Sequence, residues 1–148
     1  MRFRKISLEI IVALLIILFI YTGLNKMLDY TNFKFQLGRS PFIQSMSGFI
    51  AATLPAGEIL VATLLVFKPT RMLGLYASFI LMALFTGYIW LMLHYAYDLP
   101  CSCGGVLAVL SWKDHLIFNG VFTIISLIGI LLQGKNNSIT SSPTHKIA

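Results

Sequence analysis

The sequence predicts an all-α integral membrane protein, built as a bundle of four transmembrane helices. Of its 148 residues, 57% are hydrophobic and only 11% are charged, whereas about a quarter of the residues of a soluble domain are charged. The mean hydropathy is +0.85, and the apolar residues fall into stretches near the roughly 20 residues that cross a bilayer. A soluble protein of this size has no interior large enough for so much apolar surface.

Four long apolar stretches follow one another along the chain, at about residues 6–22, 47–67, 72–95 and 116–132. The first follows Arg2, Arg4 and Lys5, as a signal peptide would, but no small-residue cleavage site comes after it. We therefore expect a retained helix. The first and last stretches are the shortest, so they are expected to stand nearly upright or to thin the bilayer.

The segments between and after the spans differ in character. In "VFKPTRM", proline stops one helix and Lys68 and Arg71 are expected to anchor a tight turn. The segment from Leu24 to Met46 interleaves apolar residues with charges, so it is expected to lie on the membrane surface or to cover the bundle as a lid. Residues 1–133 thus form one membrane domain, and the polar residues 134–148 are expected to form a flexible tail.

The basic residues predict how the spans are oriented. In the four-span arrangement seven lie on one side, namely Arg2, Arg4, Lys5, Lys68, Arg71, Lys135 and Lys146, and four on the other, namely Lys26, Lys34, Arg39 and Lys113. The more basic side is normally cytoplasmic, so both termini are predicted to be cytoplasmic. The basic residues occur singly or in small groups between apolar runs, which does not indicate a nucleic-acid surface despite a pI of about 9.6.

The loop between the third and fourth spans faces outward in this topology, and it holds both cysteines of the chain, in "YDLPCSCGGVLAVLSW". Cys101 and Cys103 can form a disulfide if the backbone turns, and Gly104 and Gly105 allow such a turn. A three-residue loop would add only about 1.6 kcal/mol of stability, against about 4.7 for a hundred-residue loop. Strained, exposed disulfides exchange readily, so redox chemistry explains the pair better than stability.

A metal site is an alternative use of the same thiols. Two thiolates so close in sequence can hold Cu(I) or share Zn²⁺, with His94, His115 or Met92 completing the set. The chain has no second cysteine pair, which disfavours a closed zinc site. The copper alternative would use Cys101, Cys103 and His115.

One acidic residue lies near the middle of the second span. A charge at the position of Glu58 costs on the order of 3 kcal/mol on insertion scales. Glu58 shares a helix face with Ala51, Pro55 and Ala62, a small and kinked face that suits contact with neighbouring helices. We expect Glu58 to relay protons or contact a cofactor, or else to form a hydrogen bond between helices. Glu9, near the inner end of the first span, is expected to reach the interface and is given no role.

The fourth span carries a polar stripe, His115, Asn119, Thr123 and Ser126, spaced by four, four and three residues. His115 follows Cys103 by twelve residues, and a protonated histidine near a thiol favours the thiolate. The alternative is an ordinary histidine at the membrane interface.

These features together resemble the MauE/DoxX group of redox-associated membrane proteins. The resemblance rests on four spans, on the outward "PCSCGG" and on "SWKDHLIFN" opening the fourth span. In addition, "YTGLNKMLDYTNF" is similar to the group's Gly-x-x-Lys segment and "LPAGEILVATLL" to its second span with an internal glutamate. The resemblance covers about residues 21–132. It implies a bacterial inner-membrane bundle linked to thiol-disulfide chemistry, with Cys101 and Cys103 as redox pair and Glu58, Lys26 and His115 at positions typical of the group.

The sequence thus predicts a thiol-disulfide redox protein that acts on the periplasmic face of the bacterial inner membrane. One cysteine would form a mixed disulfide with a partner and the other would resolve it. The expected partner is a thioredoxin-like or other periplasmic thiol protein. By analogy with other membrane thiol oxidases, a quinone is the candidate electron acceptor. Two rival classes stay open: a copper-binding or transport protein, and a non-catalytic membrane subunit of a maturation or secretion complex.

Overall fold

The computed structural model describes residues 2–95 and 110–140, and within these ranges it contains helices and turns without a strand. The four long helices are α1 (Arg2–Leu28), α3 (Ser47–Val66), α4 (Arg71–Tyr95) and α5 (Trp112–Thr140). Each of the four helical stretches is long and apolar enough to cross a membrane. The predicted all-α fold with four membrane-spanning helices is therefore confirmed.

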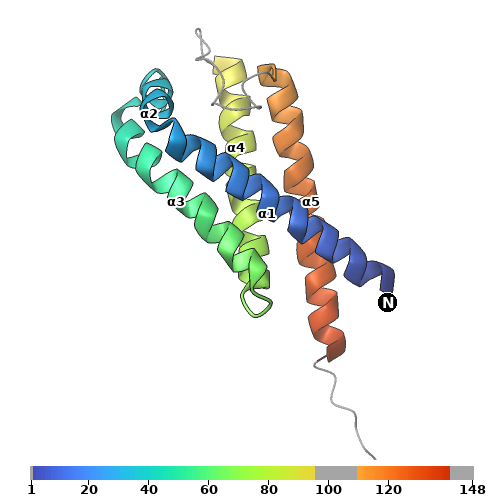
Figure 1. The fold of residues 1–148 in the computed structure, drawn as a ribbon. Coiled ribbons are helices and arrows are strands. Elements are labelled where there is room, and N and C mark those ends of the chain that lie inside the picture. The colour runs from blue at the N-terminus through green and yellow to red at the C-terminus, as the bar shows by residue number, and fades with distance from the viewer. Residues whose placement is uncertain (1, 96–109, 141–148) are drawn as a thin grey trace, which may run out of the picture.

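The long helices contact one another in the cyclic order α1, α3, α4, α5. In Figure 1, α1 runs diagonally across the bundle toward the N-terminal end of α3. The start of α1, the turn between α3 and α4 and the end of α5 lie at one end of the bundle, as a four-span topology requires. The core between them draws buried residues from every long helix, for example Leu15, Leu65, Leu75 and Ile130.

The first and last helices are longer than the sequence predicted. α1 has 27 residues and α5 has 29, and helices of this length tilt in the bilayer or extend beyond the hydrocarbon. α1 does not end near residue 22, because the polar residues that follow face other helices instead of water. Lys26, for example, bonds to a side chain of α3.

α5 also continues into the stretch expected to be a flexible tail, and it remains helical through Thr140. Polar side chains support this last part from within the helix. The Gln133 amide donates to Asn137 Oδ1 at 3.2 Å, and the Ser138 hydroxyl donates to the carbonyl of Gly134 at 3.1 Å. Sequence polarity was therefore a poor guide to where this helix ends.

The turn between α3 and α4 is held by bonds to the neighbouring helices. The Thr70 hydroxyl donates to the carbonyl of Leu64 at 2.9 Å. Arg71 is only 8% exposed, and its Nη1 lies 2.7 Å from Glu9 Oε1 on α1. The role of Glu9 thus differs from the expectation: it does not simply reach the interface but pairs with the arginine that begins α4.

The segment after α1 covers the other end of the bundle, which corresponds to the lid alternative. It forms α2 (Tyr30–Gly38) and a short 3-10 helix, η1 (Gln44–Met46). Phe33 and Leu37 of α2 are buried against Ala51 of α3. After α2, Ser40 is fully buried and accepts a hydrogen bond from the Tyr88 hydroxyl of α4 at 2.8 Å. The segment is therefore fixed to both α3 and α4.

Candidate functional site

A cavity of about 480 Å³ lies between the long helices, in the half of the bundle that α2 covers. Ligand pockets in proteins commonly have volumes of about 300–1,000 Å³. Most of the wall is aliphatic or aromatic. The polar side chains among the lining residues include Asn25, Lys26, Glu58, Tyr88, His115 and Asn119. A mainly apolar cavity with a few converging polar groups is the usual form of a small-molecule site.

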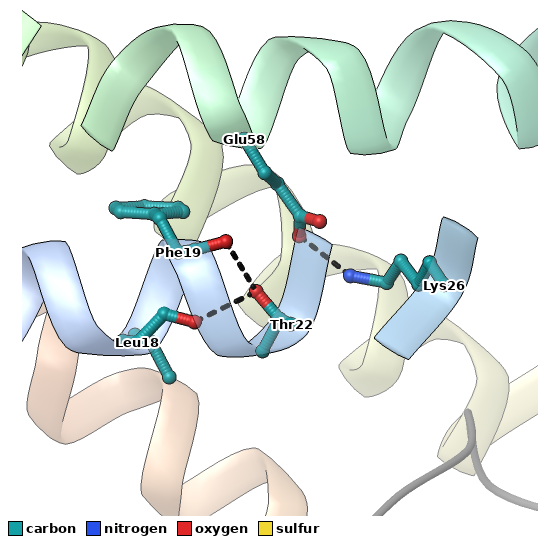
Figure 2. Close-up of polar contacts among 5 residues, drawn as sticks. All are labelled: Leu18, Phe19, Thr22, Lys26 and Glu58. Carbon is teal, nitrogen blue, oxygen red and sulfur yellow. Dashed lines mark hydrogen bonds and ion pairs between the residues drawn. The ribbon is translucent and has the colours of Figure 1, made fainter. Parts of the chain in front are cut away.

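The central polar contact of this cavity is an ion pair between α1 and α3. Lys26 Nζ lies 2.5 Å from Glu58 Oε1, and Figure 2 shows the two side chains reaching toward each other. Glu58 is 1% exposed and Lys26 is 15% exposed. The ammonium also lies over two aromatic rings, 5.3 Å from the centroid of Phe85 and 5.8 Å from that of Phe33. The two charges compensate each other, which offsets much of the cost of burying either one.

A glycine allows α1 to approach α3 closely enough for this pair. A Cβ on Gly23 would lie 3.0 Å from Ile59 Cδ1 and 3.4 Å from Glu58 Cβ. Lys26 follows Gly23 by three residues and so lies on nearly the same face of α1. Thr22 is also next to the pair, but its hydroxyl donates within its own helix, to the Leu18 carbonyl at 3.0 Å. The Gly-x-x-Lys spacing in the sequence thus has a structural reason.

The faces predicted for the second and fourth spans are those that turn inward. Ala51, Pro55, Glu58 and Ala62 are all buried on α3. On α5, the stripe residues His115, Asn119 and Ser126 are buried. Thr123, between them, is 3.2 Å from the Thr86 hydroxyl of α4. The helical period of the polar residues was therefore sufficient to predict these faces.

The start of α5 is fixed by a capping arrangement that also positions His115. The backbone N–H of Asp114 donates to Ser111 Oγ at 3.2 Å, and the Ser111 hydroxyl donates to Asp114 Oδ2 at 2.6 Å. A serine before the first turn with an acidic residue three positions later is a typical N-terminal cap. His115 follows directly, is 9% exposed and lines the cavity.

Two buried polar atoms at this cavity have no hydrogen-bond partner among the described residues. They are Glu58 Oε2 and Asn25 Nδ2. Both residues line the cavity. Buried polar atoms are normally paired, so each exception calls for an explanation, such as an absent water or ligand. Two residues of the cavity wall therefore carry an unpaired buried atom, one an acceptor and the other a donor.

The structure brings together four of the polar residues singled out in the sequence: Lys26, Glu58, His115 and Asn119 all line one cavity. Cys101 and Cys103 lie outside the described residues. Asn25 was missed, although it lies in the quoted "YTGLNKML" segment. Its position next to Lys26 could have indicated it. Both residues were instead expected in an outer loop, because the first span was expected to end near residue 22.

The other suggested metal ligands have different surroundings. His94 is exposed, with its Nδ1 2.9 Å from the Trp90 carbonyl oxygen. Met92 is fully buried, and its sulfur accepts a hydrogen bond from the Ser40 hydroxyl at 3.6 Å. Within the described ranges, no group of three or more His, Cys, Asp or Glu side chains is placed to hold a metal ion. His115 is the described member of the copper alternative, and it faces the cavity.

Comparison with known proteins agrees with the architecture. Residues 4–132 match the family model described as methylamine utilisation protein MauE. No curated protein and no solved structure matched the chain. The family match takes in all four long helices up to Leu132, together with the cavity and its ion pair. The chain therefore belongs to the MauE family and is a multi-pass membrane protein.

Proposed function

We propose that this protein is a thiol-disulfide redox protein of the bacterial inner membrane, which exchanges disulfides with a periplasmic protein through Cys101 and Cys103. The main support is the position of the cavity. It lies in the half of the bundle that holds the end of α4 and the start of α5, which the cysteine-bearing segment joins in the sequence. Glu58 and His115, two residues that can exchange protons, line it.

The chemistry of such an exchange needs groups of this kind. A thiolate attacks a sulfur of the partner's disulfide, and the second cysteine resolves the mixed disulfide that forms. Each cycle moves two electrons and releases or takes up protons. His115, in the first turn of α5 beyond the loop, is suited to take up a proton from a thiol, and Glu58 is suited to pass protons inside the bundle.

Trapping of mixed disulfides tests the proposal. Cys101→Ser and Cys103→Ser each leave one thiol that cannot be resolved from within the chain. At least one of these variants should accumulate a covalent complex with a periplasmic thiol protein, visible as a band that a reductant removes. The double variant, Cys101→Ser with Cys103→Ser, is the matched control and should form none.

Other outcomes would favour the rival functions. Full complementation of a deletion strain by the double serine variant, without any trapped complex, would point to a non-catalytic subunit of a maturation or secretion complex. Tight binding of one Cu(I) by the wild-type protein that the double variant loses would point to copper handling.

A further inference from the structure

We infer that the cavity is a quinone site, in which a lipid-soluble quinone takes the two electrons released when Cys101 and Cys103 form a disulfide. The assignment of the two cysteines as electron donor rests on the proposed function. The site itself consists only of described residues, from α1, α2, α3, α4 and α5. The site lies among helices that span the membrane, and a lipid-soluble ligand fits such a place.

The wall of the cavity suits a flat, apolar ring. Phe19, Phe33, Phe85 and Phe118 are among the residues that line it. Aromatic side chains pack favourably against other rings in offset or edge-on arrangements. The volume of about 480 Å³ is within the range of sites that enclose most of a small ligand.

The unpaired polar atoms distinguish a quinone from a lipid chain. Asn25 Nδ2 is a buried donor without a partner, and Lys26 Nζ has protons beyond the one that it shares with Glu58. These donors match the carbonyl oxygens of a quinone. Glu58 Oε2, a buried acceptor without a partner, matches the hydroxyl of the reduced quinol. An acyl chain has no polar groups to offer and would leave all three unmatched.

The redox step balances with a quinone as acceptor. Two thiols lose two electrons and two protons as the S–S bond forms. The quinone gains two electrons and two protons and becomes the quinol. Protons therefore have to reach the ring, and Glu58 and His115 are two cavity-lining groups that can carry them.

Photolabelling of the purified full-length protein in lipid nanodiscs tests the site. An azido-substituted ubiquinone should label peptides of the helices that line the cavity. Ubiquinone-1 should compete with this labelling, whereas an alkylbenzene with a tail of the same length should not. Equal competition by the alkylbenzene would overturn the inference, because it would show that the ring oxygens are not recognised.

Two substitutions on α3 form a matched pair. Leu54 lines the cavity, whereas Leu60 is 60% exposed on the outside of the bundle. Leu54→Trp should reduce labelling at least tenfold by filling the space, and Leu60→Trp should leave it unchanged. Asn25→Leu should weaken competition by ubiquinone-1 roughly tenfold, as expected for the loss of one hydrogen bond. Labelling that is insensitive to Leu54→Trp would show that the quinone binds elsewhere.

The same labelling separates this inference from the proposed function. The double variant Cys101→Ser with Cys103→Ser should be labelled as strongly as the wild type, since no cysteine belongs to the site. Trapped partner complexes without cavity labelling would overturn the quinone site alone. Cavity labelling without any trapped complex would leave the quinone site standing and overturn the thiol-disulfide function.

Discussion

At the scale of single residues, the partner of Glu58 determines how much stability the protein should lose when Glu58 is replaced. Polar contacts between helices in membranes average less than about 1 kcal/mol, which is the cost expected from the sequence for a simple hydrogen bond. The partner is instead the ammonium of Lys26. Removing one member of a buried ion pair leaves an uncompensated charge, which costs about 3–5 kcal/mol in soluble proteins. Removing either member alone should therefore cost more than the sequence suggested.

Substitutions of Glu58 should separate its structural role from its chemical one. Glu58→Gln keeps an acceptor for Lys26, so it should fold with a moderate loss of stability. Glu58→Leu should lose more, up to about 3–5 kcal/mol, and adding Lys26→Met should recover part of this loss because the stranded charge is gone. Thermal unfolding in one detergent measures all three variants. A double variant no more stable than Glu58→Leu would contradict the ion-pair explanation.

The same Glu58→Gln variant tests proton transfer. Glutamine cannot release a proton, so redox cycling of Cys101 and Cys103 should be largely lost although the protein assembles normally. The readout is the redox state of the two cysteines in cells, measured by the mass shift on thiol alkylation. An unchanged redox state would leave Glu58 with a purely structural role.

The residue scale also shows where reading the sequence succeeded and where it did not. The inward faces around Glu58 and His115 could be predicted, because a helix repeats its faces every 3.6 residues and buried polar residues in a span face other helices. The partner of Glu58 could not, because pairing between α1 and α3 depends on how closely their backbones approach. Gly23 contributes to this approach, because its missing side chain leaves room for that of Ile59.

At the scale of helices, two glycines of α4 have very different surroundings. A Cβ on Gly74 would lie 3.0 Å from the backbone nitrogen of Leu65 and 3.1 Å from the carbonyl carbon of Leu64. Backbone atoms cannot rotate away as a flexible side chain can. A Cβ on Gly87 would meet nothing within 4 Å. Gly74 therefore permits α4 to pack against the end of α3, whereas Gly87 has no such role.

The two alanine substitutions should accordingly have opposite results. Gly74→Ala should destabilise the protein by about 1–3 kcal/mol, the usual cost of overpacking. Gly87→Ala should be neutral, or stabilise by up to about 1 kcal/mol, because alanine is the better helix former. The midpoints of thermal unfolding in the same detergent compare them. A similar midpoint for both would mean that α3 and α4 can separate at little cost.

Helix existence could be predicted and helix length could not. The four apolar stretches were sufficient to identify the spans, since length and hydropathy are what the bilayer selects. The ends of α1 and α5 extend further because Lys26 and Gln133 have partners that compensate their polarity. The cover formed by α2 and η1 had too little periodicity for a firm prediction, and its position depends on long-range contacts such as that of Ser40 with Tyr88.

At the scale of the whole molecule, the charge distribution predicts orientation in the membrane. Two basic residues, Lys26 and Arg71, form ion pairs between helices, with Glu58 and Glu9 respectively. Lys26 and Arg71 lie on opposite sides of the predicted topology. Leaving both out of the count lowers each side by one basic residue, so the same side remains the more basic one. The start of α1, the α3–α4 turn and the end of α5 share one end of the bundle, which fits a single cytoplasmic face.

Thiol labelling tests this orientation independently of any activity. Reduced Cys101 and Cys103 should react with a membrane-impermeant maleimide added to intact spheroplasts, because the loop between α4 and α5 is predicted to be periplasmic. A cysteine introduced at Lys68, in a cysteine-free background, is the control and should react only after lysis. The reverse pattern would place the cysteine pair in the cytoplasm, and the periplasmic function would fail with it.

The ion pair between α1 and α3 also has an electrical consequence. The pair is neutral as a unit, and it lies inside two membrane spans. Whenever Glu58 holds a proton, the positive charge of Lys26 stands alone within the field across the membrane. Moving one elementary charge through the whole field is worth about 2.3 kcal/mol per 100 mV, and a charge that appears part of the way across experiences a fraction of this. If protons pass through Glu58, an energised membrane therefore biases each turnover of the cysteine pair, and collapsing the membrane potential shifts the resting ratio of thiol to disulfide even when partner and quinone stay the same.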